Sequence, residues 1–275
     1  MSETRRKAIG LIAGEGRFPF LVAQGIRQQG YRIVAAGFRD HTSEELYPVA
    51  DRMIWLRLGQ LGKLLNYFKS NGVDRVVFAG PINKPRALGI IPDFRAARLL
   101  FRTRSKHDGE IFQALIHTLH NEGIEVLSPL SFVPALKTPE GSLGKRKPSK
   151  KEEADISFGW PLAKEIGSLD IGQCLVVKDN IVIAVEAVEG SDATILRAGE
   201  LAGPGCVVIK VFKPGQTDTI DQPAVGLQTI RTMVQAGASC LALEAEECLF
   251  FDRQDAIELA DAQDISVVGY CSPKD

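Results

Sequence analysis

Short apolar runs alternate with amphipathic stretches that end in glycine over the first half of this chain, and this alternation constrains its fold more than any other feature. The run Ala8–Ala13 is apolar throughout, which is typical of a parallel strand buried on both faces. Strands are expected at 8–13, 32–38, 53–58, 73–79 and 125–127, and helices at 18–29, 60–71 and 108–122. Strands separated by helices of this length predict βαβ units, and therefore a parallel sheet with right-handed crossovers.

The second half predicts another α/β domain, with a mixed sheet. A helix is expected from Ile156 to about Ile166, followed by a hairpin whose strands flank Lys178-Asp179-Asn180. The expected strands are 174–177, 181–185, 207–212, 241–243 and 266–268, and the later helices are 223–236 and 252–262.

Residues 131–156 separate the two patterns. This stretch contains Pro134, Pro139 and Pro148 and the basic run 145–151, and its hydrophobic periodicity stops. A chain of 275 residues, at about 150 per domain, favours two domains over one large domain. We therefore expect a domain at 1–132, a linker at 133–156 and a second domain at 157–275, with the basic run as a solvated face.

The charge balance and the cysteines exclude several classes of protein. Lys and Arg total 33 and Asp and Glu total 34, so the net charge of -1 is unlike that of a general nucleic-acid binder. No apolar run approaches the roughly 20 residues of a membrane helix, and Met1–Lys7 lacks the apolar region of a signal peptide. The 5 cysteines show no CxxC spacing, which favours a reducing compartment without structural zinc. We expect a cytoplasmic protein without a nucleic-acid partner.

Glycine-rich turns follow two of the predicted strands. Gly14-Glu15-Gly16 lies where open α/β sheets bind ligands, and exposed N–H groups at a helix start favour a phosphate there. The third glycine of a dinucleotide fingerprint is missing, so the hypothesis of a nicotinamide-dependent oxidoreductase depends on this turn alone. A turn with a purely structural role is the alternative. Gly80 opens the same edge of the sheet, and Asn83 and Lys84 are placed to hold an anion.

A basic segment lies between Lys84 and Lys106. Two stripes recur there at i, i+3 and i+7, one basic and one apolar: Arg95, Arg98 and Arg102, and Phe94, Ala97 and Phe101. One interpretation is a surface helix with its apolar face in the core. The other is contact with a phosphate-bearing amphiphile or an anionic bilayer surface.

Acidic residues gather at predicted strand ends in the second half: Glu186, Glu189, Asp192, Asp218 and Asp221. Clustered carboxylates suit Mg²⁺, which takes one or two of them together with substrate phosphates. Lys210 and Lys213 would balance these acids or hold a phosphate. For Asp221 the alternative is the N-cap of a helix begun by Pro223.

Five longer stretches complete the pattern: 10–19, 79–85, 169–173, 184–192, and 213–216 continued through 221–223. In this order they resemble the LpxI-type UDP-2,3-diacylglucosamine pyrophosphatases of lipid A biosynthesis, and they span residues 8 to about 270. The resemblance implies a Rossmann-like N-terminal domain, an α/β C-terminal catalytic domain and an active site between them. It also implies hydrolysis, assisted by Mg²⁺ (or Mn²⁺), to UMP and 2,3-diacylglucosamine 1-phosphate, which is lipid X.

The resemblance assigns roles to two residues, and the residue pattern described above supplies the other site residues. The family's essential aspartate matches Asp221, and Asp192 matches the acid of its Gly-Thr-Asp segment, with Ser191 in place of threonine. Asp218 and Glu189 are added as metal ligands beside these two. The expected substrate-binding residues are Gly14, Glu15, Gly16, Gly80, Asn83, Lys84, Ser191, Lys210, Lys213 and Gln216.

Two family segments differ in this chain. The Gln-Asp-x-Arg-x-Asp stretch reads Gln216-Thr217-Asp218-Thr219-Ile220-Asp221, so one acid and one arginine are absent, and the Gly-Asp-Asp segment reads His107-Asp108-Gly109. A non-catalytic paralogue that binds a nucleotide-sugar or a lipid phosphate is therefore the alternative. The diacylated substrate and its product are the expected partners, while a homo-oligomer and peripheral contact with the inner membrane stay open.

Overall fold

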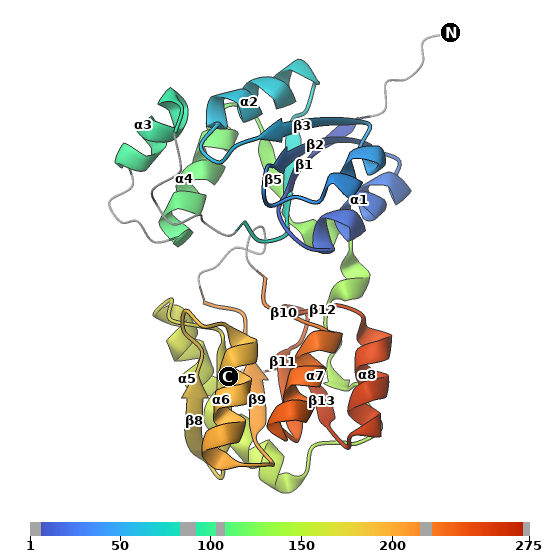
Figure 1. The fold of residues 1–275 in the computed structure, drawn as a ribbon, viewed down its shortest axis with the longest axis vertical. Helices are drawn as coiled ribbons and strands as arrows, with labels where there is room; N and C mark the ends of the chain where they lie inside the picture. The colour runs from blue at the N-terminus through green and yellow to red at the C-terminus, as the bar shows by residue number, and fades with distance from the viewer. Residues whose placement is uncertain (1–6, 83–91, 103–107, 215–221, 272–275) are drawn as a thin grey trace. The chain divides into compact units, whose positions relative to one another are not determined.

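The structure of the protein is a computed structural model that describes residues 7–82, 92–102, 108–214 and 222–271 (Figure 1). The chain divides into two compact units, one of residues up to Pro134 and one of residues from Ala135, apart from residues 217–221, which lie outside the described ranges. Each unit has its own sheet and its own apolar core, so each is described by itself.

A parallel sheet of 5 strands forms the centre of the N-terminal unit. The strands are β1 (Ala8–Ala13), β2 (Arg32–Phe38), β3 (Arg52–Leu56), β4 (Arg75–Ala79) and β5 (Glu125–Leu127). Their order, β3-β2-β1-β4-β5, is that of doubly wound α/β sheets, and every pair is parallel. The parallel sheet predicted from the alternation of apolar runs is confirmed.

Helices cover both faces of this sheet. Ile9 and Leu11 of β1 share a core with α1 (Phe18–Gln28) and the 3-10 helix η1 (Glu44–Val49). Ile12 belongs to the opposite core, which includes residues of α2 (Leu61–Ser70), α3 (Phe94–Arg102) and α4 (Asp108–Asn121). Because both faces are covered, all of β1 is buried, and this explains its continuous apolar run.

The C-terminal unit contains a mixed sheet of 6 strands in the order β6-β13-β11-β9-β7-β8. The strands are β6 (Gly141–Ser142), β7 (Cys174–Lys178), β8 (Ile181–Val185), β9 (Val207–Lys210), β11 (Cys240–Glu244) and β13 (Ser266–Tyr270). β9, β11 and β13 are parallel, whereas β6, β7 and β8 join antiparallel at the edges. This confirms the predicted mixed α/β class of the second half.

One long helix covers one face of this sheet and three shorter helices cover the other (Figure 1). α5 (Lys150–Ser168) packs Ile156 and Trp160 against β7 and β9. The opposite core includes residues of α6 (Ser191–Ala202), α7 (Leu227–Ala236) and α8 (Arg253–Ala262). A parallel pair, β10 (Ala224–Val225) and β12 (Leu249–Phe250), forms a separate ribbon.

Three expectations about the C-terminal unit are corrected. α5 begins at Lys150 rather than near Ile156, because Ser149 and Glu152 form a capping box. α7 begins at Leu227 with Gly226 as its N-cap, so the interpretation of Asp221 as the N-cap of a helix begun by Pro223 is wrong. α6 was not predicted, since its first turn was taken for the end of a strand.

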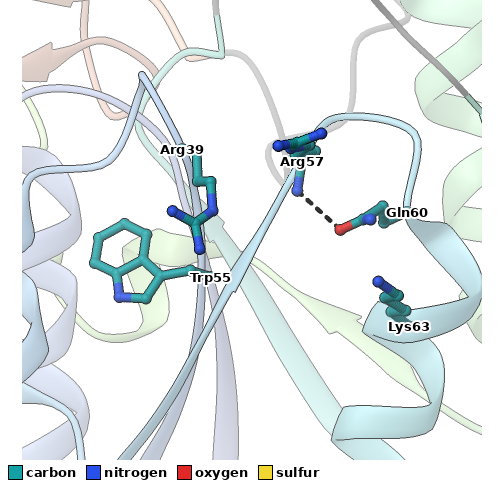
Figure 2. Close-up of a pocket in the computed structure, with 5 residues that line it drawn as sticks. All are labelled: Arg39, Trp55, Arg57, Gln60 and Lys63. Carbon is teal, nitrogen blue, oxygen red and sulfur yellow. Dashed lines mark hydrogen bonds between the residues drawn. The ribbon is translucent and has the colours of Figure 1, made fainter.

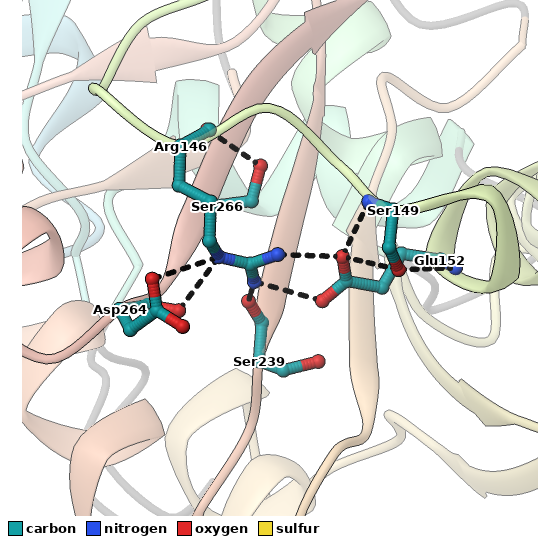
Figure 3. A network of polar contacts seen from close by, with 6 residues as sticks. All are labelled: Arg146, Ser149, Glu152, Ser239, Asp264 and Ser266. Atoms are coloured by element: carbon teal, nitrogen blue, oxygen red, sulfur yellow. Dashed lines mark hydrogen bonds and ion pairs between the residues drawn. The ribbon is translucent and has the colours of Figure 1, made fainter.

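Part of the expected linker 133–156 is ordered structure of the C-terminal unit. β6 pairs with β13, and Arg146, inside the basic run, is enclosed by polar groups (Figure 3). Its guanidinium donates two hydrogen bonds of 2.8 Å to the two oxygens of Glu152, and its Nε donates to the Asp264 carbonyl at 2.8 Å. Arg146 also donates to the carbonyl of Ser239. The solvated-face interpretation is therefore wrong for Arg146.

No helix within the described part of the chain combines the length and the apolarity needed to cross a bilayer.

Candidate functional site

Lys210, the last residue of β9, is a buried lysine with 6% of its surface exposed. Its Nζ donates to Ser191 Oγ at 2.8 Å and to the carbonyl of Ala224 at 2.9 Å. A buried ammonium is costly unless it is paired, so these contacts stabilise the charge. They use two of its three donors and tie the first residue of α6 to β10.

Ser191 connects this lysine to a buried carboxylate. Its hydroxyl donates to Glu186 Oε1 at 2.8 Å, and Glu186, which follows β8, has 8% of its surface exposed. The other oxygen of Glu186 accepts a hydrogen bond of 3.1 Å from the amide N–H of Gln173. One serine hydroxyl therefore joins two buried groups of opposite charge. Ser191 and Lys210, both predicted site residues, are brought together.

The segment after β9 is held at its start by a second cation, the partly buried Lys164. Lys164 Nζ donates to both carboxylate oxygens of Glu244, at 2.8 Å each, and to the carbonyl of Phe212 at 2.8 Å. The amide N–H of Phe212 donates to Glu244 Oε2 at 2.7 Å. Phe212 is therefore fixed through both of its backbone polar groups, two residues beyond the end of β9.

The same segment is held at its other end by the β10–β12 ribbon. The amide N–H of Leu249 donates to the carbonyl of Pro223 at 2.8 Å, one residue before the carbonyl that Lys210 holds. Gln216, Asp218 and Asp221 lie in 215–221, outside the described residues. The structure thus fixes the two ends of the segment that carries them.

Glu189 and Asp192 lie on either side of the start of α6, in different surroundings. Glu189 Oε1 accepts from Arg197 at 2.8 Å, and Oε2 accepts from the N–H of Ala187 at 3.1 Å. Backbone N–H groups and Arg197 lower the pKa of Glu189. Asp192 lies exposed in the first turn of α6. Across the described ranges, no group of three His, Cys, Asp or Glu side chains is arranged to hold a metal ion.

Lys213, the last predicted basic site residue, pairs outside this cluster. Its Nζ donates to Asp170 Oδ1 at 2.8 Å, and Asp170 is largely exposed. The structure therefore does not bring Lys213 to Ser191.

Gly14 and Gly80 allow two loops of the N-terminal unit to touch through their backbones. The N–H of Gly14 donates to the carbonyl of Ala79, and the N–H of Glu15 donates to the carbonyl of Pro81, both at 2.8 Å. A Cβ on Gly14 would lie 2.3 Å from the Pro81 oxygen, so a larger residue does not fit. These two N–H groups are satisfied within the protein, and the structural interpretation of the turn holds for them. A phosphate at this turn would have to bind at Gly16, whose φ is +79° and where a Cβ would have no neighbour within 4 Å.

The carboxylate of Glu15 contacts His41, with 2.6 Å between Oε1 and Nδ1. Asn83 and Lys84 lie outside the described residues.

α3 leaves Phe94, the first residue of the apolar stripe that its spacing suggested, open to solvent. Phe94 is 83% exposed, while Ala96 and Leu99 pack in the core. Arg95 donates to Glu122 at 2.7 Å. Phe94 therefore does not belong to the core face of this helix.

Sequence reasoning missed a basic pocket at the ends of β2 and β3. It is lined by Arg39, Trp55, Arg57, Gln60 and Lys63 (Figure 2). The available signal was the position of Arg39 and Arg57, each directly after a buried strand residue.

The buried cysteines are not candidates for catalysis. Burial raises the pKa of Cys174, Cys240 and Cys248 to about 12, so these thiols stay protonated near neutral pH. They behave as the small hydrophobes expected from their strand positions.

Replacing Lys210 by Met tests whether this cluster stabilises the C-terminal unit. The variant leaves Glu186 buried without its cation and the Ala224 carbonyl without its donor, so we expect the free energy of unfolding to fall by about 2–3 kcal/mol. Urea unfolding of the whole chain measures the change. Lys213→Met, which removes an ion pair to the exposed Asp170, should cost less than about 1 kcal/mol. Equal losses in the two variants would contradict this account of Lys210.

Fold and site together define a protein of two α/β units, with a buried lysine–serine–glutamate cluster in one and a basic pocket in the other. The LpxI N-terminal domain model matches residues 8–136, and the LpxI C-terminal domain model matches residues 139–268. The chain is 32% identical to the UDP-2,3-diacylglucosamine pyrophosphatase LpxI of Caulobacter vibrioides, over 96% of this chain and 97% of that protein. The chain belongs to the LpxI family.

Solved structures are more distant. A biotin carboxylase domain of a thermophilic 2-oxoglutarate carboxylase aligns with 61% of this chain and 34% of its own, at 12% identity and a TM-score of 0.27. N5-carboxyaminoimidazole ribonucleotide synthetase from Thermotoga maritima covers 66% of this chain and 42% of its own, at 15% identity and a TM-score of 0.25. At this level of similarity, neither structure indicates the function of this chain.

Proposed function

We propose that this chain hydrolyses the diphosphate of UDP-2,3-diacylglucosamine to UMP and 2,3-diacylglucosamine 1-phosphate, in lipid A biosynthesis. The observation that carries the proposal is the 32% identity to the Caulobacter pyrophosphatase over nearly the whole length of both proteins. One water is consumed: its oxygen bonds to the phosphorus nearer the sugar, and the P–O–P bridge breaks on that side. The bridging oxygen leaves with UMP. We further propose that residues of both domains contribute to the site.

The chain's own residues have two tasks in this reaction, to hold the diphosphate and to aim the water. Among the described residues Lys210 uses two of its three donors, and α6 begins beside it without a side-chain cap, a combination suited to a phosphate oxygen. Ser191 and Glu186 fix the direction of the Lys210 ammonium. Asp221, matched by the resemblance, orients the attacking water or holds the cation. Lys84, which follows a predicted strand of the N-terminal sheet, meets the diphosphate.

The described donors partly fit Mg²⁺ (or Mn²⁺). Asp192 is exposed at the start of α6 and is suitable as a ligand together with Asp218 and Asp221. Glu189 does not fit, because both of its oxygens accept hydrogen bonds from Arg197 and Ala187. We therefore leave Glu189 out of the proposed ligand set. When bound, the cation supplies charge neutralisation for the diphosphate.

The acyl chains require an apolar surface. Phe94 is 83% exposed at the start of α3, with the basic side chains of Arg95 and Arg98 on the same helix. We propose that this end of α3 contacts the acyl chains or the inner membrane face, where an aromatic ring beside basic groups binds favourably.

The test is a direct assay of the purified chain with UDP-2,3-diacylglucosamine and Mg²⁺. We expect UMP and the sugar 1-phosphate in equal amounts by mass spectrometry, loss of turnover with excess EDTA, and its return with added Mg²⁺. UDP-N-acetylglucosamine, which lacks the long chains, should react at about one tenth of that rate or more slowly still. Equal turnover of both would refute the role of the acyl chains. Tight binding without turnover would favour the non-catalytic paralogue.

A further inference from the structure

The basic pocket of the N-terminal unit lies at the carboxyl edge of its parallel sheet. Arg39 follows β2, Trp55 and Arg57 lie at the end of β3, and Gln60 and Lys63 lie at the start of α2 (Figure 2). Its volume is about 340 Å³, within the range of small-molecule sites. Ligands of open α/β sheets bind at this edge.

The charge of the pocket points to an anion. Three of the lining side chains are cationic and none is acidic. Arg39, Arg57 and Lys63 form no ion pair with any other residue in the described ranges. Three like charges around one cavity repel each other, and a ligand carrying phosphate oxygens relieves that repulsion.

Gln60 adds hydrogen-bond donors to the same wall. Its side-chain Oε1 accepts a hydrogen bond of 3.0 Å from the amide N–H of Arg57, which fixes which way the amide faces. The amide N–H groups are then directed away from that contact and are available to acceptor atoms of a ligand.

Trp55 gives the pocket an aromatic wall. It lies opposite Gly37 in the β2–β3 register, and a Cβ on Gly37 would lie 3.0 Å from the indole Cζ3. The absence of a side chain at position 37 therefore makes room for the ring against β2. A partly exposed indole beside arginines suits a planar base, which inorganic phosphate and a lipid headgroup both lack.

We infer that this pocket binds the nucleotide end of the substrate, with phosphate oxygens on Arg39, Arg57 and Lys63 and the base against Trp55. The inference rests on the proposed function for the identity of the nucleotide. It assigns this end of the substrate to residues that neither the glycine-rich turns nor the acidic cluster includes.

Tryptophan fluorescence gives a direct readout, because the chain has only two tryptophans. Trp160 is buried and its indole N–H has no hydrogen-bond partner in the described structure, so Trp160→Phe is a mild change that leaves Trp55 as the reporter. In this background UMP should change the fluorescence saturably. Arg39→Gln and Arg57→Gln should each raise the Kd of UMP about ten-fold. Arg27→Gln, on an exposed arginine of α1, is the matched control and should leave Kd unchanged.

Inorganic phosphate and AMP separate the parts of the ligand. Weaker binding of phosphate than of UMP supports a contribution of the base, and equal binding would overturn the nucleotide assignment. AMP that binds as UMP does supports stacking on Trp55, because stacking does not select one base. Calorimetric titration of Arg57→Gln in the otherwise unchanged chain gives the same Kd comparison if the Trp160→Phe background fails to fold.

Kinetics distinguishes failure of this inference from failure of the proposed function. Arg57→Gln should raise KM about ten-fold and change kcat little, as expected when a ground-state contact is lost. Hydrolysis with an unchanged KM in the Arg39 and Arg57 variants would overturn the pocket and leave the proposed function intact. UMP binding that depends on Arg57, in a chain that does not hydrolyse the substrate, would refute the proposed function and leave the pocket intact.

Discussion

Asp221→Asn should retain the fold of the parent chain and lose UMP release by about 100-fold or more. The variant keeps the size of the side chain and removes its negative charge, so it can neither hold a cation nor accept the proton of the attacking water. UMP release by the purified variant, with circular dichroism as the folding check, measures the effect. Wild-type turnover in Asp221→Asn would contradict the assignment.

Two further aspartate variants serve as comparisons for the loss of UMP release in Asp221→Asn. Asp170→Asn removes an exposed carboxylate from the C-terminal unit, and because asparagine tolerates the left-handed backbone of that position (φ 56°), it should fold and react normally. Asp218→Asn tests the acid that stands one residue from the family's first aspartate. A loss in Asp218→Asn comparable with that in Asp221→Asn would assign both carboxylates to one site, whereas a comparable loss in Asp170→Asn would indicate a general sensitivity to charge.

The contacts around Lys210 and Lys164 explain how such a segment can be positioned. Lys164 and Glu244 fix Phe212, and Lys210 fixes Ala224, so both ends of the Asp221 segment are attached to the sheet. These charged contacts hold the flanking residues Phe212 and Ala224 in place. The residue pattern pointed to Lys210 as a phosphate contact, and its structural partners add a positioning role.

The parallel sheet was predictable because it depends on local patterns. β1, β2 and β5 have the predicted bounds. For β1 the reason is that a strand buried on both faces is apolar along its whole length. The hairpin of β7 and β8 was equally predictable, because Asp179 and Asn180 form a short turn with positive φ, which suits these residue types.

Long-range polar contacts were not predictable from the same patterns. Arg146 looked like one member of a solvated run, yet it bonds Ser239 and Asp264, which are about a hundred residues away in the sequence. Gly14 and Gly80 looked like a phosphate turn, yet they allow two loops to pack backbone against backbone. In each case the interaction partner belongs to another strand or loop, and the spacing of residues in the sequence does not reveal that partner.

The candidate site was likewise predictable only in part. Ser191 and Lys210 were both predicted as site residues, and the structure brings them together, although Ser191 begins α6 rather than ending a strand. Glu189 shared the acidic pattern with Asp192, but its pairing with Arg197 depends on α6, which was not predicted. The basic pocket was missed because its five residues come from three elements and form no motif.

Arg146→Met should destabilise the C-terminal unit by about 3–5 kcal/mol at neutral pH. The substitution leaves the Glu152 carboxylate, 6% exposed, without its bidentate partner, and breaking a buried pair from one side is costly. Urea unfolding measures the loss. Lys147→Met, at an exposed lysine of the same run, is the control and should change the free energy of unfolding by less than about 0.5 kcal/mol. Similar losses in the two variants would show that the whole basic run 145–151 is a solvated face.

The same pair predicts a dependence of stability on pH. Burial raises the pKa of Glu152, but hydrogen bonds from Arg146, Ser239 and Ser149 outweigh this effect and lower the pKa to about 2, from 4.5. Because the folded protein holds this carboxylate ionised, its contribution is complete above pH 4.5 and is lost as the pH falls toward 2; the shift corresponds to about 3 kcal/mol. The difference in unfolding free energy between the parent chain and Glu152→Gln should therefore shrink over that interval. A difference that stays constant from pH 5 down to the acid limit of folding would show that Glu152 stabilises through its shape rather than its charge.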